Sequence, residues 1–277
     1  MNHRPKKSLG QNFLKSEVIV DKIIEAAELS KNDTVLEIGP GQGMLTKKIL
    51  ASAGHIIAVE KDHDLISGLE TTFFKDISSK KLDIINADIL EFNPKDLKTK
   101  DYKLVANIPY YITGAIIEKF LSTSIQPKTM VLMVQKEVAE RIIAKDKKTG
   151  GAGKESILSI AVKAYGNPVY ICTVKAGNFV PAPTVDSAVI KIEHISRKNF
   201  KTNHHEEVFF QIMKAGFAHK RKTLAGNLKN VLEPEIVERA LSAVGLRPTA
   251  RAEDVGITTW LEMANIVYTM QYESASA

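Results

Sequence analysis

The sequence contains a single cysteine, Cys172, among 277 residues. One thiol excludes an intrachain disulfide, and its position in an apolar, strand-like run favours a buried, inert side chain. The sequence also lacks any apolar run of about 18 residues, the length that a membrane span requires. Residues 1–10 are polar and basic, without the apolar stretch of a secretory signal. These absences predict a cytoplasmic protein.

Metal-ligand spacing is missing as well. No His, Cys, Asp or Glu residues recur at the intervals of a metal site, and the adjacent His204 and His205 lie in a basic segment, so we expect no metal.

Hydrophobic residues make up 44% and charged residues 25% of the chain, which excludes general disorder. The length suits one large domain, or one domain with a smaller companion.

Positive charge is concentrated late in the sequence. The formal net charge is +6, and residues 197–230 contain eight basic and two acidic side chains. Residues 231–277 contain three basic and seven acidic side chains. The basic segment favours a polyanionic partner, although a solvated basic face would have the same composition. Within it, Lys220, Arg221 and Lys222 are predicted to face this polyanion.

Strand-like and helix-like segments alternate through the first two-thirds of the sequence. Ser16 is a candidate cap for a helix in which Val18, Ile19, Ile23 and Ala27 would share a face. Segment 157–165 is ambiguous between helix and strand. We expect strands over 34–39, 55–60, 82–88, 103–107, 129–135, 170–175 and 188–193, and helices over 44–53, 62–74, 114–121, 136–144, 206–217, 234–244 and 259–270.

The repeated strand–helix units predict an α/β fold with a mostly parallel sheet and helices on both faces. After residue 196 the strands stop, and a polar, basic stretch over 194–204 has the character of a linker. We therefore predict a domain over 1–196 and a small, all-helical domain over 197–277.

A glycine-rich turn follows the first long strand. Gly39, Gly41 and Gly43 lie between this strand and the next helix, where glycine lets the backbone turn tightly and approach a ligand. Glu60 ends the next strand, 21 residues after Gly39, and a carboxylate there can accept both hydroxyls of a ribose. We expect Glu37, Glu60 and Asp88 at the carboxyl ends of adjacent parallel strands, where open α/β sheets bind ligands.

The spacing of the glycines distinguishes between nucleoside cofactors. A dinucleotide site requires a third glycine where this sequence has Met44. The observed pattern, Glu-x-Gly-x-Gly-x-Gly, is instead typical of S-adenosylmethionine sites. Together with the seven expected strands, this pattern predicts a Rossmann-like methyltransferase sheet.

The fourth strand ends in Asn107-Ile108-Pro109-Tyr110. The exocyclic amine of adenine is a poor nucleophile because its lone pair is delocalised into the ring. The Asn107 side-chain oxygen and the Ile108 carbonyl could accept its hydrogens and localise that lone pair, while Tyr110 stacks on a flipped-out base. A strand end with a simple proline turn is the alternative interpretation. The motif predicts an amino methyltransferase.

These motifs, in this order, closely resemble the family of small-subunit rRNA adenine dimethyltransferases. The resemblance extends over nearly the whole chain, because the motifs that match the family lie at residues 10–14, 37–43, 60, 88, 107–110, 135–141, 179–188, 217–224 and 251–253.

The resemblance implies a role for each matching site residue. Asn12 and Leu14 would contact the methionine part of S-adenosylmethionine, and the loop at Gly39 and Gly41 would line the cofactor. Glu60 would hold the ribose, and Asp88 would contact the adenine amine. Asn107 would lie between cofactor and target, and Tyr110 and Phe179 would sandwich the target base.

The family's activity implies the target. Such enzymes dimethylate two adjacent adenosines in the loop of the 3′-terminal helix of 16S rRNA in the immature small subunit, and we expect a monomer. One alternative is the erythromycin-resistance class, which acts on 23S rRNA; residues 220–224 and 251–253 argue against it. Another alternative is a non-catalytic RNA-binding assembly factor. Such a protein would have lost the glycine pattern of 39–43 or the asparagine at 107, and both are present here.

One segment departs from the family. A Tyr-Gly pair usually precedes its Leu-Ser-Val run, whereas Lys154-Glu155-Ser156-Ile157 precedes the corresponding residues here. This atypical segment comprises residues 146–157.

Overall fold

The computed structural model describes residues 5–6, 9–144 and 153–275 of the chain. The chain divides into two compact units. The first comprises Met1–Ala139 and Gly166–Ile195, and the second comprises Glu140–Tyr165 and Ser196–Ala277. The change at Ser196 lies at the predicted linker, while residues 140–165 group with the helical unit.

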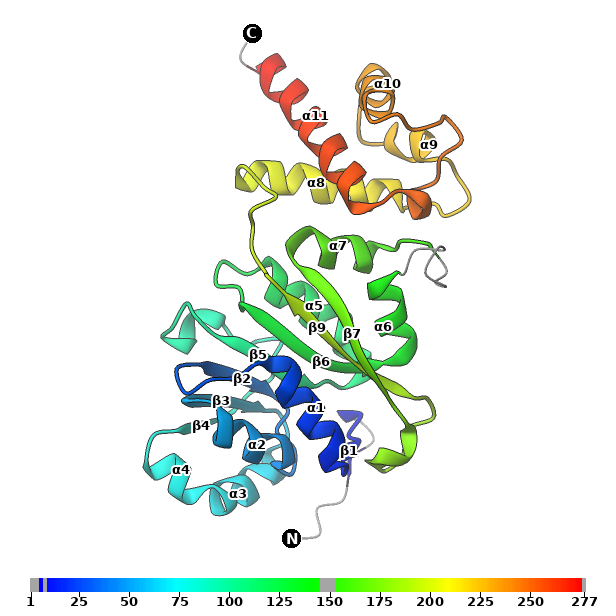
Figure 1. The fold of residues 1–277 in the computed structure, drawn as a ribbon. Coiled ribbons are helices and arrows are strands. Elements are labelled where there is room, and N and C mark those ends of the chain that lie inside the picture. Colours follow the sequence, from blue (N-terminus) through cyan, green and yellow to red (C-terminus); the bar gives the residue numbers. More distant parts are fainter. Residues whose placement is uncertain (1–4, 7–8, 145–152, 276–277) are drawn as a thin grey trace. The chain divides into compact units, whose positions relative to one another are not determined.

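A seven-stranded sheet forms the centre of the first unit, with the order β4-β3-β2-β5-β6-β9-β7 (Figure 1). The pairs along β4-β3-β2-β5-β6 are parallel, and β9 pairs antiparallel with both β6 and β7. The predicted mostly parallel, seven-stranded sheet is confirmed. The strands are β2 (Thr34–Ile38), β3 (His55–Glu60), β4 (Leu82–Asn86), β5 (Lys103–Asn107), β6 (Thr129–Gln135), β7 (Asn167–Val174) and β9 (Ser187–Glu193).

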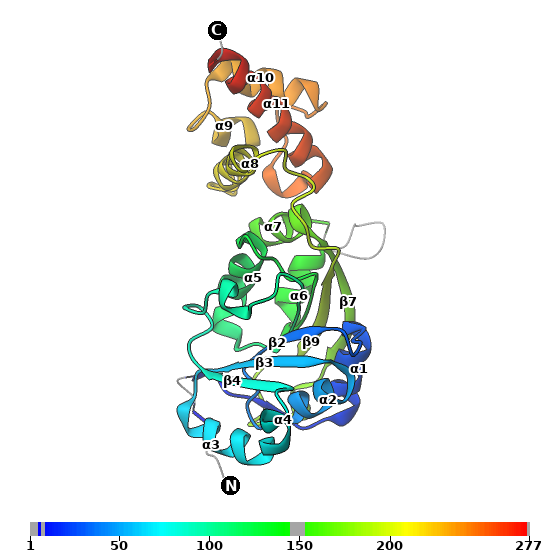
Figure 2. The ribbon, with the colours of Figure 1, turned by 90° about the vertical axis from the view of Figure 1, so that its left-hand side faces the viewer.

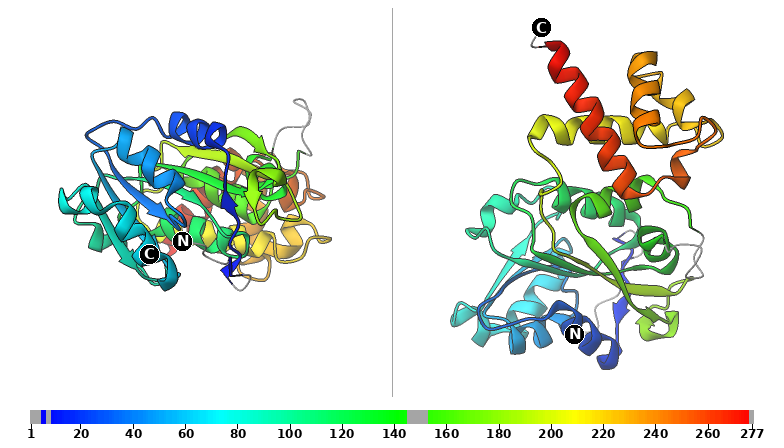
Figure 3. Two further views of the ribbon diagram at one scale, coloured as in Figure 1. Left: turned by 90° about the horizontal axis from the view of Figure 1, so that it is seen from below. Right: turned by 45° about the horizontal axis from the view of Figure 1, so that its top comes forward.

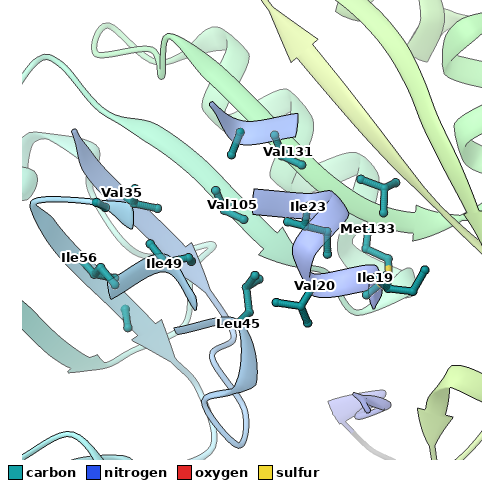
Figure 4. Close-up of a cluster of buried hydrophobic side chains, with 14 of the residues drawn as sticks. Ile19, Val20, Ile23, Val35, Leu45, Ile49, Ile56, Val105, Val131 and Met133 are labelled. Carbon is teal, nitrogen blue, oxygen red and sulfur yellow. The ribbon is translucent and has the colours of Figure 1, made fainter. Parts of the chain in front are cut away.

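Apolar residues on both faces of the strands explain why helices cover both sides. Helix α1 (Glu17–Ala27) packs on one face with α2 (Met44–Ser52) through a buried cluster (Figure 4). On the opposite side lies α5 (Thr113–Ser122) (Figure 2). The side chains of the pictured cluster include Ile19, Val20 and Ile23 from α1, Leu45 and Ile49 from α2, and Val35, Ile56, Val105, Val131 and Met133 from the strands.

Several local expectations differ from the structure. Ser16 precedes α1 but makes no side-chain cap, and Val18 is exposed while Val20 takes its place on the buried face. The helix expected over 62–74 is two helices, α3 (His63–Thr72) and α4 (Phe74–Ser78). Two short strands that the sequence did not predict, β1 (Phe13–Leu14) and β8 (Phe179–Val180), pair antiparallel. Two-residue strands carry too little periodicity to be recognised.

The second unit is helical around a core that includes the fully buried Trp260. Segment 157–165 is a helix, and α11 (Ile257–Ala275) packs across α8 (Asn203–Gly216) (Figure 3). Helix α6 (Lys136–Ile143) begins in the first unit and continues into the second. The remaining helices of the second unit are α7 (Ile157–Tyr165), α8 (Asn203–Gly216), α9 (Leu224–Leu228), α10 (Pro234–Ala243) and α11 (Ile257–Ala275).

The segment that departs from the family is tied to the second unit. The Lys154 ammonium pairs with the carboxylate of Glu253, and the Glu155 amide donates to the Glu253 carbonyl at 2.8 Å. The Glu155 side chain also pairs with Lys163 at 2.7 Å. Residues 146–152 of this segment lie outside the described residues.

Candidate active site

The order of the strands reverses between β2 and β5, and a cavity lies there. In open α/β sheets this reversal separates the loops that follow neighbouring strands and leaves a crevice at their carboxyl ends. The empty volume of the cavity is about 1120 Å³, including its open mouth. Its lining includes segments 9–14, 38–42, 59–61, 87–89 and 107–112.

The glycine turn gives a ligand access to the backbone. Gly39, Gly41 and Gly43 all have positive φ, the conformation that favours glycine. A Cβ at Gly39 would have no atom within 4 Å, so the cavity is open beside its backbone. A Cβ at Gly41 would lie 3.1 Å from the Phe13 ring, so glycine is needed there for close packing.

Glu60 ends β3, as predicted, and its side chain is buried against the glycine turn. One carboxylate oxygen accepts the Gly41 amide at 3.1 Å and the other accepts the Asp62 amide at 2.8 Å. Burial raises the pKa of Glu60, and these two amides oppose the rise. A carboxylate offers about four acceptor positions, so Glu60 keeps acceptor capacity for a ligand hydroxyl.

Asp88 lies two residues beyond the end of β4, not at its last residue. Its Oδ2 accepts from the Lys61 ammonium at 2.7 Å, and its Oδ1 accepts the Leu90 amide at 2.9 Å. The Lys61 hydrogen bond is the largest influence and lowers the pKa of Asp88. Both side chains line the cavity.

Asn107 ends β5 with its side-chain amide already oriented. The NH₂ group donates to the Asn12 carbonyl at 3.2 Å, so the side-chain oxygen is left as an acceptor. Asn12 in turn donates from its own side chain to the Gly10 carbonyl at 3.1 Å. Asn12, Leu14 and Asn107 all line the cavity, as the predicted site requires.

The two predicted base-stacking residues have different environments. Tyr110 lines the cavity, and its hydroxyl hydrogen-bonds to Ser187 Oγ at 2.7 Å. Burial raises the pKa of Tyr110. Phe179 is 2% exposed, packs in the core of the first unit and is absent from the residues that line the cavity. The structure therefore brings Tyr110, but not Phe179, to the cavity.

Asp62 is a functional candidate that the sequence analysis missed. Its side chain is fully buried, and its oxygens accept from the Lys6 ammonium at 2.5 Å and from the Gln11 amide at 2.7 Å. It also caps α3 and donates its own amide to Glu60. The sequence does contain a signal for Asp62, because it lies two residues after Glu60 and directly before a helix, where aspartate is a common cap.

Glu37 does not reach the cavity. Its side chain is buried, and neither of its carboxyl oxygens has a hydrogen-bond partner among the described residues. Burial raises the pKa of Glu37 to about 8; the nearby Thr46 hydroxyl opposes this rise and the charge of Glu60 adds to it. Glu37 is therefore protonated at neutral pH.

The candidate phosphate-binding residues lie in the second unit. Lys220, Arg221 and Lys222 are all exposed, between α8 and α9. Their exposure leaves the three cations accessible to a polyanion.

The described part of the chain contains no cluster of three or more His, Cys, Asp or Glu side chains that could hold a metal ion. None of its helices is long and apolar enough to cross a membrane.

The sequence matches the family model for ribosomal RNA adenine dimethylase over residues 2–269. The chain belongs to this family. A relative from Dehalococcoides mccartyi (strain CBDB1), named ribosomal RNA small subunit methyltransferase A, is 42% identical over 264 residues, covering 94% of this chain and 87% of the relative. A relative of the same name from Clostridium botulinum (strain Okra / Type B1) is 38% identical over 265 residues, covering 95% of this chain and 94% of the relative.

Two solved structures have the same fold. A dimethyladenosine transferase from Plasmodium falciparum aligns with a TM-score of 0.73 and 28% identity, covering 91% of this chain and 95% of that one. The 23S rRNA methyltransferase ErmE also aligns with a TM-score of 0.73, at 26% identity, covering 93% of this chain and 100% of that one. The predicted methyltransferase fold is confirmed, and the chain is an rRNA adenine dimethyltransferase.

Proposed function

We propose that this enzyme uses S-adenosylmethionine to dimethylate two adjacent adenosines in the loop of the 3′-terminal helix of 16S rRNA in the immature small subunit. The observation that carries the proposal is Asn107, whose amide is oriented at the end of β5 in the cavity that the buried Glu60 also lines. The small-subunit relatives support this target over 23S rRNA. The proposal includes a cytoplasmic location, because small subunits assemble there.

The residues around the cavity fit the proposed cofactor. The open backbone at Gly39 accommodates a ligand without a clash, and the acceptors on Glu60 suit a ribose diol. Asp88 would accept the adenine amine, while Asn12 and Leu14 would contact the methionine part. When bound, S-adenosylmethionine supplies an electrophilic methyl group on a sulfonium.

Asn107 would act on the target adenine. Its free side-chain oxygen would accept one hydrogen of the exocyclic amine, and the Ile108 carbonyl would accept the other. Both acceptors would stabilise positive charge as it develops on the nitrogen. Because alignment of two bound reactants can contribute about 7–11 kcal/mol, holding the amine is the main catalytic task of these residues.

Tyr110 would stack on the flipped-out base, and its hydrogen bond to Ser187 would hold the ring in place. Phe179 is proposed as the second stacking residue. Its contact with a base requires the ring to leave the core, because the side chain is buried. We therefore expect Tyr110→Ala to reduce turnover more than Phe179→Ala at equal stability.

Single-turnover methyl transfer to unmethylated small subunits tests the role of Asn107. Asn107→Ala should lower the rate at saturating RNA and cofactor, because the lost contact is made at the reacting centre. Asn107→Asp keeps an acceptor and should retain more activity. A normal rate for Asn107→Ala, with products resolved as mono- and dimethyladenosine, would show that the proposed role is wrong.

A further inference from the structure

Tyr111 is an exposed aromatic residue at the mouth of the cavity. It is 61% exposed, although its neighbour Tyr110 is half-buried. Among the exposed large apolar side chains of the described residues, only Tyr111 lines the cavity. Single exposed apolar side chains are common on protein surfaces, so the informative feature is the position of this ring at the cavity.

The ring of Tyr111 has a defined position. A Cβ at Gly10, which has a φ of 62°, would lie 3.3 Å from two of its ring carbons, so the glycine backbone packs directly against the ring. Tyr111 also lies in the short 3₁₀ turn Tyr110–Ile112, which leads directly into α5. The ring is thus supported on one side and open on the other.

A cation lines the same cavity as this ring. Lys61 is the only Lys or Arg among the described residues that line the cavity, and its side chain is 53% exposed. The hydrogen bond to Asp88 raises the pKa of Lys61. The Lys61 ammonium donates to Asp88, which leaves two of its three hydrogens for another acceptor.

An exposed aromatic ring and an exposed cation that line one cavity fit single-stranded nucleic acid, in which a base stacks on the ring and the backbone phosphate contacts the cation. We propose that Tyr111 stacks on the nucleotide next to the target adenine and that Lys61 contacts the adjoining phosphate. This inference rests on the proposed function. It explains how one adenosine could occupy the cavity while its neighbour stays ordered at the rim.

The test measures binding and single-turnover methylation of unmethylated small subunits by the full-length enzyme. Tyr111→Ala should lower the methylation rate at subsaturating RNA by about 5- to 150-fold, the range for loss of one base stack. Tyr111→Phe keeps the ring and should restore most of the loss. Cofactor affinity, measured by calorimetry, should change less than twofold in both variants.

Phe74→Ala is the matched control, because Phe74 is 69% exposed in the same unit and does not line the cavity. Lys61→Ala should flatten the slope of log affinity against log salt by about 0.7, the contribution of one phosphate contact on a single strand. A wild-type rate for Tyr111→Ala, or an equal loss for Tyr111→Phe, would refute the stacking role. If the wild-type enzyme itself failed to methylate small subunits, the proposed function would fail instead.

Discussion

At the residue scale, burial and hydrogen-bonding partners decide what each acidic side chain near the cavity can do. Burial raises the pKa of Glu37 and of Glu60, but only Glu60 lines the cavity. The pKa of Asp62 is lowered although burial alone would raise it, because Lys6 and Gln11 donate to its carboxylate. Four similar carboxyl groups, counting Asp88, thus have four different environments.

Glu60 should be the main binding determinant for the ribose. Each charge-assisted hydrogen bond to a buried carboxylate contributes about 1.5–3 kcal/mol, so Glu60→Ala should weaken cofactor binding well over tenfold. The Ala variant leaves the amides of Gly41 and Asp62 without their acceptor, and Glu60→Gln keeps an acceptor for only one of them, so thermal unfolding of each variant separates lost binding from lost stability. Calorimetry would measure the affinity, with exposed Glu70→Gln as control; unchanged affinity would remove Glu60 from the site.

Glu37 should make stability depend on pH. Its pKa is about 8 in the folded chain, against 4.5 for an unperturbed glutamate, so the folded state binds a proton that the unfolded state releases between these values. Stability should therefore fall as pH rises from about 4.5 to 8, by on the order of 1 kcal/mol per unit. Glu37→Gln should remove this dependence. Denaturant unfolding at pH 5 and pH 8 measures the free energy of unfolding of the wild type and of Glu37→Gln. An equal change in this free energy in both proteins would contradict the prediction.

At the scale of elements, the segment before α1 forms one side of the cavity. It contributes residues 9–14 to the lining, pairs through β1 with β8, and is anchored to the start of α3 by Asp62. Asp62 also donates its amide to Glu60. The anchor therefore links the position of this segment to the carboxylate proposed to hold the ribose.

Asp62→Ala should loosen that segment. Loss of the α3 cap alone costs about 1 kcal/mol, and without its anchor the segment should bind the cofactor at least tenfold more weakly. Asp64→Ala is the matched control, because Asp64 pairs with the same Lys6 but is 62% exposed, and such a pair contributes little. Calorimetry and thermal unfolding measure both effects. Equal affinities for the two variants would exclude an anchoring role for Asp62.

At the scale of the whole molecule, the cavity and the cluster of basic residues belong to different units of the chain. The cavity belongs to the first unit, whereas the strongly basic residues Lys220, Arg221 and Lys222 belong to the second. The family to which the chain belongs acts on ribosomal RNA, whose phosphates attract such cations. This division predicts that RNA affinity and cofactor affinity can be changed separately.

Replacing Lys220, Arg221 and Lys222 by alanine should flatten the slope of log RNA affinity against log salt by about 2, because each phosphate contact contributes roughly 0.7–0.9. Cofactor affinity should stay unchanged. A control triple variant of exposed Lys75, Lys81 and Lys95 in the first unit removes the same charge. If both triple variants changed the slope equally, net charge rather than a local contact would account for RNA binding.

The sequence by itself predicted the sheet, the glycine turn, Glu60 at the end of β3 and Asn107 at the end of β5. These features depend on local patterns: buried strands read as continuous apolar runs, and a tight turn requires glycine. The sequence also predicted most helices, although it placed Val18 on the buried face of α1 and missed α9.

Tertiary structure alone decided which side chains meet at the cavity. It buried Phe179 in the core, exposed Tyr111 at the rim and joined Asp62 to Lys6 and Gln11. It also grouped residues 140–165 with the helical unit. The physical reason is that these outcomes depend on contacts between residues far apart in the chain, which neither periodicity nor spacing records.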